Sequence, residues 1–175
     1  MPHGIARNGK VQKGSHGERQ EPLLPTQNQW CRNVSRAIQH AGRGALWRRR
    51  LRVLVEGEAR GELLVCSEPI SPLGEIDPLT GELRTRSLKA SISGRILVFP
   101  WGRGSTVGSY VLYALKHYGR APSAIVVVRA DPIIATGCVI SDIPLAEGIE
   151  ERDIVELKKY KHAFFNARRG ELVAW

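Results

Sequence analysis

The sequence predicts a compact domain of the α/β class, in which short strands pack around one main helix. Two observations support this class. Between residues 96 and 129 a strand-like run, a helix-like run and a second strand-like run follow one another, as in two parallel strands joined by a crossover helix. Shorter apolar runs bounded by turn residues lie on both sides of this unit, and their length is typical of further strands.

Residues 1–50 differ in composition from the rest of the chain. They hold ten of the 26 Lys and Arg residues against only Glu18 and Glu21, so the +9 net charge comes mostly from this segment. It has little apolar periodicity, and we expect a disordered basic extension with a short helix near residues 33–41. The folded domain is predicted to span residues 51–175. Because that domain is nearly neutral, nucleic acid is not the favoured partner.

Three cysteines, Cys31, Cys66 and Cys138, are widely spaced and form no Cys-x-x-Cys pair. This pattern fits neither a disulfide framework nor a self-contained zinc or iron–sulfur site, and it favours the reducing cytoplasm. No apolar run approaches the roughly 18 residues of a membrane-spanning helix. The positively charged start lacks the apolar core of a secretory signal. We therefore expect a cytoplasmic protein without membrane contact.

The first part of the predicted domain contains strands and a long connection. The stretch LRVLVEGEARGELLVC, residues 51–66, alternates around two small turns and predicts paired strands. The Pro- and Gly-rich residues 67–83 predict a long ordered loop, in which Ser71, Asp77 and Thr80 form turns. The apolar run ILVF at residues 96–99 then predicts a buried strand.

The main helix is predicted over residues 107–118. Six residues fall on one continuous face at helical spacing: Val107, Tyr110, Val111, Ala114, Leu115 and Tyr118. Ser105 or Thr106 fits the N-cap, and Gly119 fits the position after the C-cap.

The second half of the predicted domain begins with a buried strand over residues 125–129. A short helix follows, with Asp131 as its cap, Pro132 at its first position and Gly137 near its end. The sequence SDIPL reads as a loop. Residues 153–175 predict a strand, a turn at ARRG and a final strand.

A polar loop, GRGST at residues 102–106, lies between the buried strand and the main helix. In open α/β units ligands bind at this position, where unpaired N–H groups and the helix dipole stabilise negative charge. Gly102 and Gly104 permit a close approach of a ligand, and the Arg103 guanidinium suits a carboxylate or phosphate. The spacing matches neither a Walker A motif nor the Gly-x-Ser-x-Gly nucleophile elbow. The loop alone therefore fits an anion site, or a simple turn with Ser105 as a helix cap.

Four motifs occur in order along the chain: Pro-Ile-Ser with Asp-Pro-x-Thr-Gly, Gly-x-Gly-Ser-Thr-x-Gly-Ser-Tyr, Ala-Pro-x-Ala-Ile, and Asp-Ile-Pro-Leu. Over about residues 53–145 the chain resembles the small subunit of aconitase-X-type dehydratases, in particular the archaeal phosphomevalonate dehydratases. The resemblance implies the swivelling β/β/α fold of the aconitase superfamily's mobile domain. Residues 1–50 and most of the tail after Glu147 lie outside it.

The resemblance also implies an activity. It implies dehydration of (R)-5-phosphomevalonate to trans-anhydromevalonate 5-phosphate, in a heterodimer whose large subunit binds a 4Fe–4S cluster. Ser105 takes the position of the family's proposed proton acceptor. The surrounding loop supplies the expected substrate-binding residues Gly102, Arg103, Gly104 and Thr106. The residues agree with this, because a dehydration needs a base and a Lewis acid, and this chain has no set of cysteines for a cluster.

Three other functions fit the sequence. The rival within the same superfamily is the small subunit of a hydroxyproline dehydratase, which would bind no phosphate. A nucleic-acid-binding protein would use the basic extension, and its binding would fall with salt and with deletion of residues 1–50. A regulatory module would bind a phosphate ligand at the Gly-Arg-Gly-Ser loop without catalysis.

Overall fold

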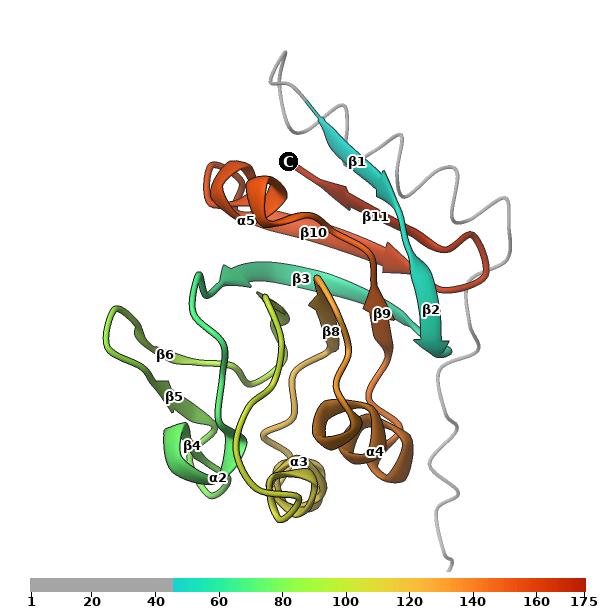
Figure 1. Cartoon of the computed structure of the whole chain (residues 1–175). Coiled ribbons are helices and arrows are strands. Elements are labelled where there is room, and N and C mark those ends of the chain that lie inside the picture. The colour runs from blue at the N-terminus through green and yellow to red at the C-terminus, as the bar shows by residue number, and fades with distance from the viewer. Residues whose placement is uncertain (1–45) are drawn as a thin grey trace, which may run out of the picture.

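The computed structural model describes residues 46–175, which form a mixed α/β domain built on a strongly curved sheet (Figure 1). The main sheet contains β1 (Trp47–Arg50), β2 (Arg52–Val55), β3 (Glu58–Val65), β7 (Ile96–Phe99), β8 (Ala124–Val127), β9 (Leu145–Glu147), β10 (His162–Asn166) and β11 (Glu171–Ala174). A small sheet contains β4 (Ile76–Asp77), β5 (Glu82–Arg84) and β6 (Lys89–Ser91). The helices are α2 (Pro72–Glu75), α3 (Gly108–His117), α4 (Pro132–Ser141) and α5 (Glu151–Leu157).

The eight strands of the main sheet lie in the order β1-β11-β10-β3-β7-β8-β9-β2. The four consecutive strands β3, β7, β8 and β9 are parallel, and the other pairs are antiparallel. Because only Leu51 separates β1 from β2, the chain itself joins the two edges of the sheet. The sheet is therefore a nearly closed barrel, which leaves little free edge.

The strand β7 is buried on both faces and divides the core in two. Leu97 and Phe99 pack into the hydrophobic cluster between the sheet and the helices α3 and α4. Ile96 and Val98 pack into a second cluster, between the curved sheet and α5. A central parallel strand with two covered faces reads as an unbroken apolar run. The predicted unit of two parallel strands joined by a crossover helix is confirmed, with β7, α3 and β8 as its parts.

The predicted pairing of strands within residues 51–66 is wrong. β2 and β3 both form, but β2 pairs with β9, and β3 pairs with β7 and β10. Alternation of apolar residues identifies a strand but carries no information about its partner. Between the two strands Gly57 adopts a φ of +149°, and a Cβ there would overlap Pro144. At this glycine the chain passes from β2 to β3, which pair with different strands of the sheet, so the two do not form a hairpin.

The predicted ordered loop over residues 67–83 contains more regular structure than expected. α2 and β4 lie within it, and β5 begins near its end. The predicted turn is confirmed, since the Asp77 carboxylate accepts hydrogen bonds from the Leu79 N–H (2.9 Å) and the Thr80 hydroxyl (2.8 Å). The strands β4 and β5 contain only two and three residues, which is too short to give a recognisable alternation.

The helix α3 buries a different face from the one predicted. Val111 and Leu115 are buried as expected, but Val107, Tyr110 and Tyr118 are 48%, 67% and 50% exposed. The buried stripe is completed by Gly108 and Leu112 instead. Gly119 follows the C-cap with a φ of +65°, which confirms the predicted end of the helix.

The fold has two main helices, because α4 is as long as α3. Its predicted start is confirmed: Asp131 is the N-cap and Pro132 the first residue. Gly137 does not end the helix, which continues to Asp142 in the left-handed conformation. A Cβ on Gly137 would lie 2.5 Å from Leu112 Cδ1 on α3, so this glycine permits close packing of the two helices. Figure 1 shows them side by side on one face of the sheet.

The two ends of the described region pack together. The predicted strand, turn and strand near the C-terminus are confirmed as β10 and β11, with α5 as an additional element. β1 lies before the predicted start of the domain at residue 51 and pairs with β11. Within this arginine-rich strand, Arg49 contacts Asp153 (2.5 Å) and Glu150 (3.1 Å), partners that the sequence places a hundred residues away.

The predicted helix near residues 33–41, Cys31 and residues 1–45 of the extension lie outside the described residues. Within residues 46–175, no helix is long and apolar enough to cross a membrane.

Replacing Gly137 with valine should separate α3 from α4. Because the new side chain meets Leu112, we expect the free energy of unfolding to fall by about 2 kcal/mol. Thr136→Val is the control, since it also places a valine on α4, at the neighbouring exposed position, and should change stability by less than about 0.5 kcal/mol. Urea unfolding measures both values, and equal stability of the two variants would contradict this packing.

Candidate active site

The loop of residues 100–107 connects the carboxyl end of β7 to α3, and the segment before α2 holds it in place. The Ile70 N–H donates to the Trp101 carbonyl (3.1 Å), and the Arg103 N–H donates to the Ile70 carbonyl (2.8 Å). These bonds form an isolated parallel bridge between Ile70 and Gly102. The loop therefore continues the direction of β7 beyond the sheet, and α2 lies beside the start of α3 (Figure 1).

Gly102 is buried and lies against the cap of α4. Its N–H donates to Asp131 Oδ2 (2.6 Å), while Asp131 Oδ1 accepts from the N–H groups of Ile133 (2.9 Å) and Ile134 (3.2 Å). A Cβ on Gly102 would overlap the Asp131 carboxylate and Ile134. The absence of a side chain at Gly102 thus permits close contact between the loop and α4. Spacing along the sequence gave no signal for this pairing across 29 residues.

Arg103 is anchored on the other side of the loop. Its Nη2 lies 2.5 Å from Glu75 Oε1, and its Nε donates to the Pro69 carbonyl (3.1 Å). Glu75 Oε2 accepts from the Ser71 N–H (2.7 Å), so one carboxylate holds both the loop and α2. The Arg103 side chain remains half exposed. Sequence reasoning missed Glu75, although it lies only four residues after Ser71 of the Pro-Ile-Ser motif.

Gly104, Ser105 and Thr106 form the exposed tip of the loop. Gly104 has a φ of +105°, which favours glycine, and a Cβ there would lie 2.7 Å from Ser71 Oγ. Ser105 Oγ accepts a hydrogen bond from the Val107 N–H (3.3 Å). Thr106 presents its carbonyl to the Ser109 hydroxyl (2.7 Å). The loop tip therefore has a fixed backbone and an exposed serine hydroxyl.

The predicted helix cap is wrong in its details. α3 begins at Gly108 with Val107 as N-cap, and no side chain caps it. Ser105 instead caps the turn that precedes the helix, through its contact with the Val107 N–H. The Gly108 N–H donates to the Ser105 carbonyl (2.8 Å). Ser105 therefore lies one turn before the helix, near the positive end of its dipole.

The carboxylate of Glu147 holds the backbone next to Asp131. Glu147 Oε2 accepts from the Ala130 N–H (2.7 Å), and Oε1 accepts from the Arg52 guanidinium. Burial acts to raise the pKa of Glu147, but the hydrogen bonds from Ala130 and Arg52 outweigh it and lower the pKa. Glu147 therefore stays ionised at neutral pH and fixes the residue next to Asp131.

The cysteines of the described region do not form a metal site. Cys66 and Cys138 are buried, and burial raises the pKa of both thiols, so each stays protonated at neutral pH. Among residues 46–175, no group of three His, Cys, Asp or Glu side chains is placed to hold a metal ion. The described residues therefore do not fit an iron–sulfur cluster. Cys138 is a small core residue, as its isolation in the sequence predicts.

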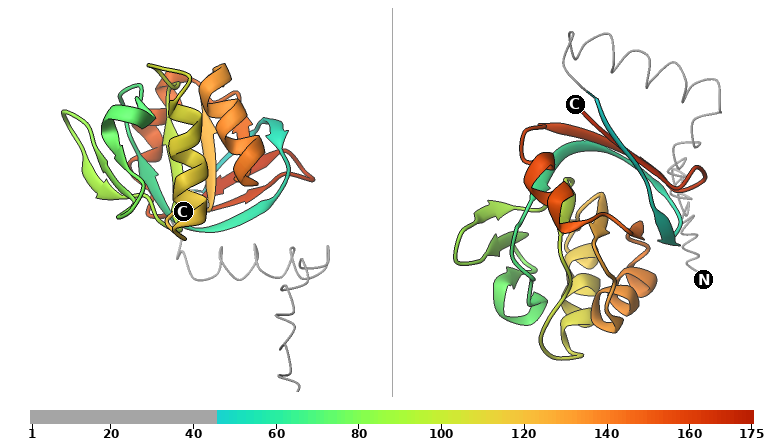
Figure 2. Two further views of the ribbon diagram at one scale, coloured as in Figure 1. Left: turned by 90° about the horizontal axis from the view of Figure 1, so that it is seen from below. Right: turned by 45° about the horizontal axis from the view of Figure 1, so that its top comes forward.

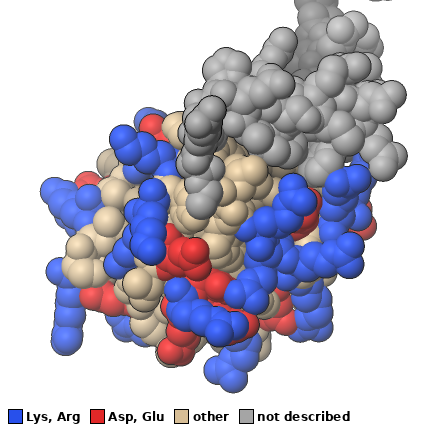
Figure 3. Space-filling model, turned by 90° about the horizontal axis from the view of Figure 1, so that it is seen from above, with Lys and Arg blue, Asp and Glu red and all other residues tan. Residues whose placement is uncertain are grey.

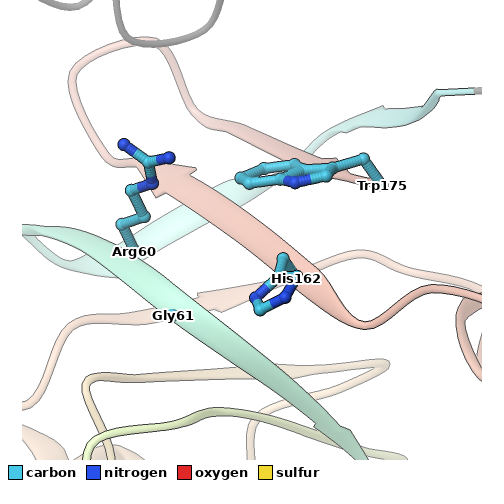
Figure 4. Close-up of a pocket in the computed structure, with 4 residues that line it drawn as sticks. All are labelled: Arg60, Gly61, His162 and Trp175. Carbon is cyan, nitrogen blue, oxygen red and sulfur yellow. The ribbon is translucent and has the colours of Figure 1, made fainter. Parts of the chain in front are cut away.

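Two hollows lie on the half of the sheet formed by β1, β11, β10 and β3, away from α3 and α4. Figure 3 shows this side, where many Lys and Arg side chains surround a few acidic ones. One hollow is lined by Arg50, Arg168, Arg169 and Glu171. The other is lined by Arg60, Gly61, His162 and Trp175 (Figure 4). There the Arg60 guanidinium lies 5.9 Å from the Trp175 ring, and neither hollow includes the loop.

Comparison with known families identifies the class. The family model described as the aconitase X swivel domain matches residues 48–174, and the chain belongs to this family. The expected swivel fold is thereby confirmed.

Individual relatives agree with this family. The chain is 48% identical over 124 residues to the phosphomevalonate dehydratase small subunit of Thermococcus gammatolerans. This alignment covers 69% of this chain and 92% of the relative. The chain is 49% identical over 115 residues to the same subunit from Pyrococcus abyssi, covering 64% and 86%. The crystal structure of Thermococcus kodakaraensis aconitase X in its holo-form matches with a TM-score of 0.66 and 42% identity, covering 74% and 98%.

Replacing Asp131 with asparagine should release the loop while leaving α4 capped. An amide accepts on one side only, so it keeps the cap through its oxygen but turns an NH₂ group toward the Gly102 N–H. We expect hydrogen exchange at the Gly102 amide to accelerate at least about tenfold, which corresponds to one lost hydrogen bond. Asp142→Asn at the other end of α4 is the control. An unchanged exchange rate at Gly102 would contradict this role of Asp131.

Replacing Glu147 with glutamine should remove a pH-dependent part of the stability. Because the pKa of Glu147 is lower in the folded state, its contribution is complete above the unfolded pKa and is lost as the pH falls through the folded one. The stability difference between wild type and Glu147→Gln should therefore be about 1 kcal/mol at pH 7 and shrink between about pH 5 and pH 3. Urea unfolding at several pH values measures it. A difference that stays constant over this range would argue against the lowered pKa.

Proposed function

We propose that this chain is the small subunit of a phosphomevalonate dehydratase, a hydro-lyase of an archaeal mevalonate pathway. The reaction would remove water from (R)-5-phosphomevalonate and yield trans-anhydromevalonate 5-phosphate. One observation carries the proposal: relatives with that name share 43–49% identity with this chain and are covered over 76–92% of their length. The exposed Ser105 in its Gly-Arg-Gly-Ser loop supports it, because a dehydration needs a proton acceptor that can reach the substrate.

Ser105 is the proposed proton acceptor. The Ser105 alkoxide takes a proton from carbon, and the C–H electron pair forms the double bond. The hydroxyl leaves the neighbouring carbon with its C–O electron pair as hydroxide, and it becomes water by taking up one proton from solvent. The serine returns its proton to solvent before the next turnover. A serine hydroxyl is a weak base in water, so its alkoxide needs stabilisation. The Val107 N–H already donates to Ser105 Oγ, and the start of α3 adds the positive end of a helix dipole. Each such donor contributes on the order of 1–3 kcal/mol in a dry site, so closure of a partner over the loop would strengthen the effect.

The loop residues around Ser105 take two proposed roles. Arg103, Gly104 and Thr106 are exposed beside Ser105, and we assign them to substrate contact. The Arg103 charge is partly neutralised by Glu75, so its contribution is a directed hydrogen bond more than a large positive potential. Gly102 already donates its N–H to Asp131, and we assign it to positioning the loop.

The partner in this proposal is a large subunit, in a heterodimer that works in the cytoplasm. The relatives are named small subunits, which supports a second chain. The 4Fe–4S cluster would belong to that subunit, because the described residues of this chain offer no ligand set for it. Two buried, protonated thiols support the choice of a reducing compartment.

Replacing Ser105 with alanine should abolish dehydration and leave the complex intact. The chain would be co-expressed with its cognate large subunit, reconstituted anaerobically with iron and sulfide, and assayed for loss of 5-phosphomevalonate. We expect kcat to fall by about 10³-fold, as for removal of a proton-transferring group. Ser87→Ala, at another exposed serine, should retain activity.

Other outcomes separate the alternatives. Full activity of Ser105→Ala would remove the serine from the mechanism and leave it a turn cap. Turnover of hydroxyproline by the wild-type complex, with none of 5-phosphomevalonate, would reassign the substrate. Salt-sensitive nucleic-acid binding without any dehydration would favour the basic extension as the functional segment.

A further inference from the structure

The helix α3 carries a second apolar stripe that the described domain leaves uncovered. Val107, Tyr110 and Tyr118 recur at helical spacing, yet they remain half to two-thirds exposed. The adjoining stripe, which includes Val111 and Leu115, fills the core. An ordinary surface helix has one apolar stripe and one polar face. A second stripe is unusual, and it contains tyrosine, a residue type that is enriched at protein interfaces.

The neighbouring helices extend this exposed surface. Tyr113 on α3, Leu73 on α2, and Val139 and Ile140 on α4 are 44–60% exposed. Figure 2 shows α2, α3 and α4 side by side on the face seen from below. We define the tyrosine surface as Leu73, Val107, Tyr110, Tyr113, Tyr118, Val139 and Ile140.

The size of the tyrosine surface is suited to a stable protein contact. A tyrosine buries about 200 Å², so the exposed parts of the three tyrosines alone amount to roughly 350 Å². The four aliphatic residues add to this area. Monomeric proteins rarely expose apolar patches of more than a few hundred Å², whereas a standard interface buries about 800 Å² per partner. The tyrosine surface would supply a large share of the centre of such an interface.

We propose that the tyrosine surface is the docking surface for the large subunit, an inference that rests on the proposed function. The surface begins at Val107, two residues after the exposed Ser105, so a partner seated on α3 would also cover the loop. A second copy of this chain on the same surface would also cover the loop, but its described residues would bring no set of metal ligands to Ser105. At the far end of α3, Lys116, His117 and Arg120 are exposed, which fits carboxylates on the rim of the partner.

Affinity measurements with the cognate large subunit test this inference. The double variant Tyr110→Ser/Tyr113→Ser removes two exposed rings without touching the core. We expect Kd for the large subunit to rise at least tenfold, which is the usual effect of losing central aromatic contacts. The matched control is Val155→Ser on α5, because Val155 is 67% exposed, as is Tyr110. Its Kd should stay within about twofold, as expected for a residue outside the interface.

The outcomes distinguish this inference from the proposed function. Weaker binding of the tyrosine variant, with normal binding of Val155→Ser, supports the docking surface whether or not the wild-type complex dehydrates 5-phosphomevalonate. Equal affinity of wild type and tyrosine variant overturns it, even where that complex is fully active. A wild-type chain that forms homodimers, which the tyrosine variant loses while binding the large subunit normally, also overturns it.

Discussion

The carboxylate of Asp131 is the interaction on which the geometry of the loop depends. One oxygen caps α4 and the other holds the Gly102 N–H, so the loop after β7 is fixed to the helix that follows β8. Gly102 follows from this constraint, and close contacts with other residues explain Gly104 and Gly108. A Cβ on Gly102 would overlap Asp131, one on Gly104 would lie 2.7 Å from Ser71 Oγ, and one on Gly108 would lie 2.9 Å from Ile133 Cγ2. These glycines permit close contacts within the protein, and Ser105 is exposed between Gly104 and Gly108.

The charges beneath the loop are paired within the chain. Glu75 neutralises part of the Arg103 charge, and Glu147 is held by Arg52 and the Ala130 N–H. What remains open at the tip is a serine hydroxyl that accepts one backbone N–H. A tip of this kind has little catalytic power by itself. It gains such power in a dry environment with further donors, which is why the proposed mechanism and the proposed docking surface require the same partner.

The sequence predicted most elements that local patterns determine. Asp131 and Pro132 marked the start of α4, Gly119 marked the end of α3, and the apolar runs marked β7 and β8, because caps and buried strands have local signatures. The predictions were wrong or absent where contacts between distant parts of the chain determine the structure. The alternation over residues 51–66 could not show that β2 and β3 separate, and no local signal links Arg49 to Asp153 or Gly102 to Asp131. The apolar spacing of α3 merged two stripes into one, because periodicity does not distinguish a buried apolar face from an exposed one. The position of the loop between β7 and α3 was predicted from the sequence, whereas the contact of Glu75 with Arg103 emerged only from the fold.

The most direct test of this account is the structure of the two-subunit complex with 5-phosphomevalonate bound. The account predicts that Ser105 Oγ lies about 3–3.5 Å from the substrate carbon that loses its proton, a distance suited to reaction. It also predicts that the tyrosine surface lies against the large subunit. A complex in which Ser105 is remote from the substrate, with a side chain of the large subunit in its place, would contradict the central claim.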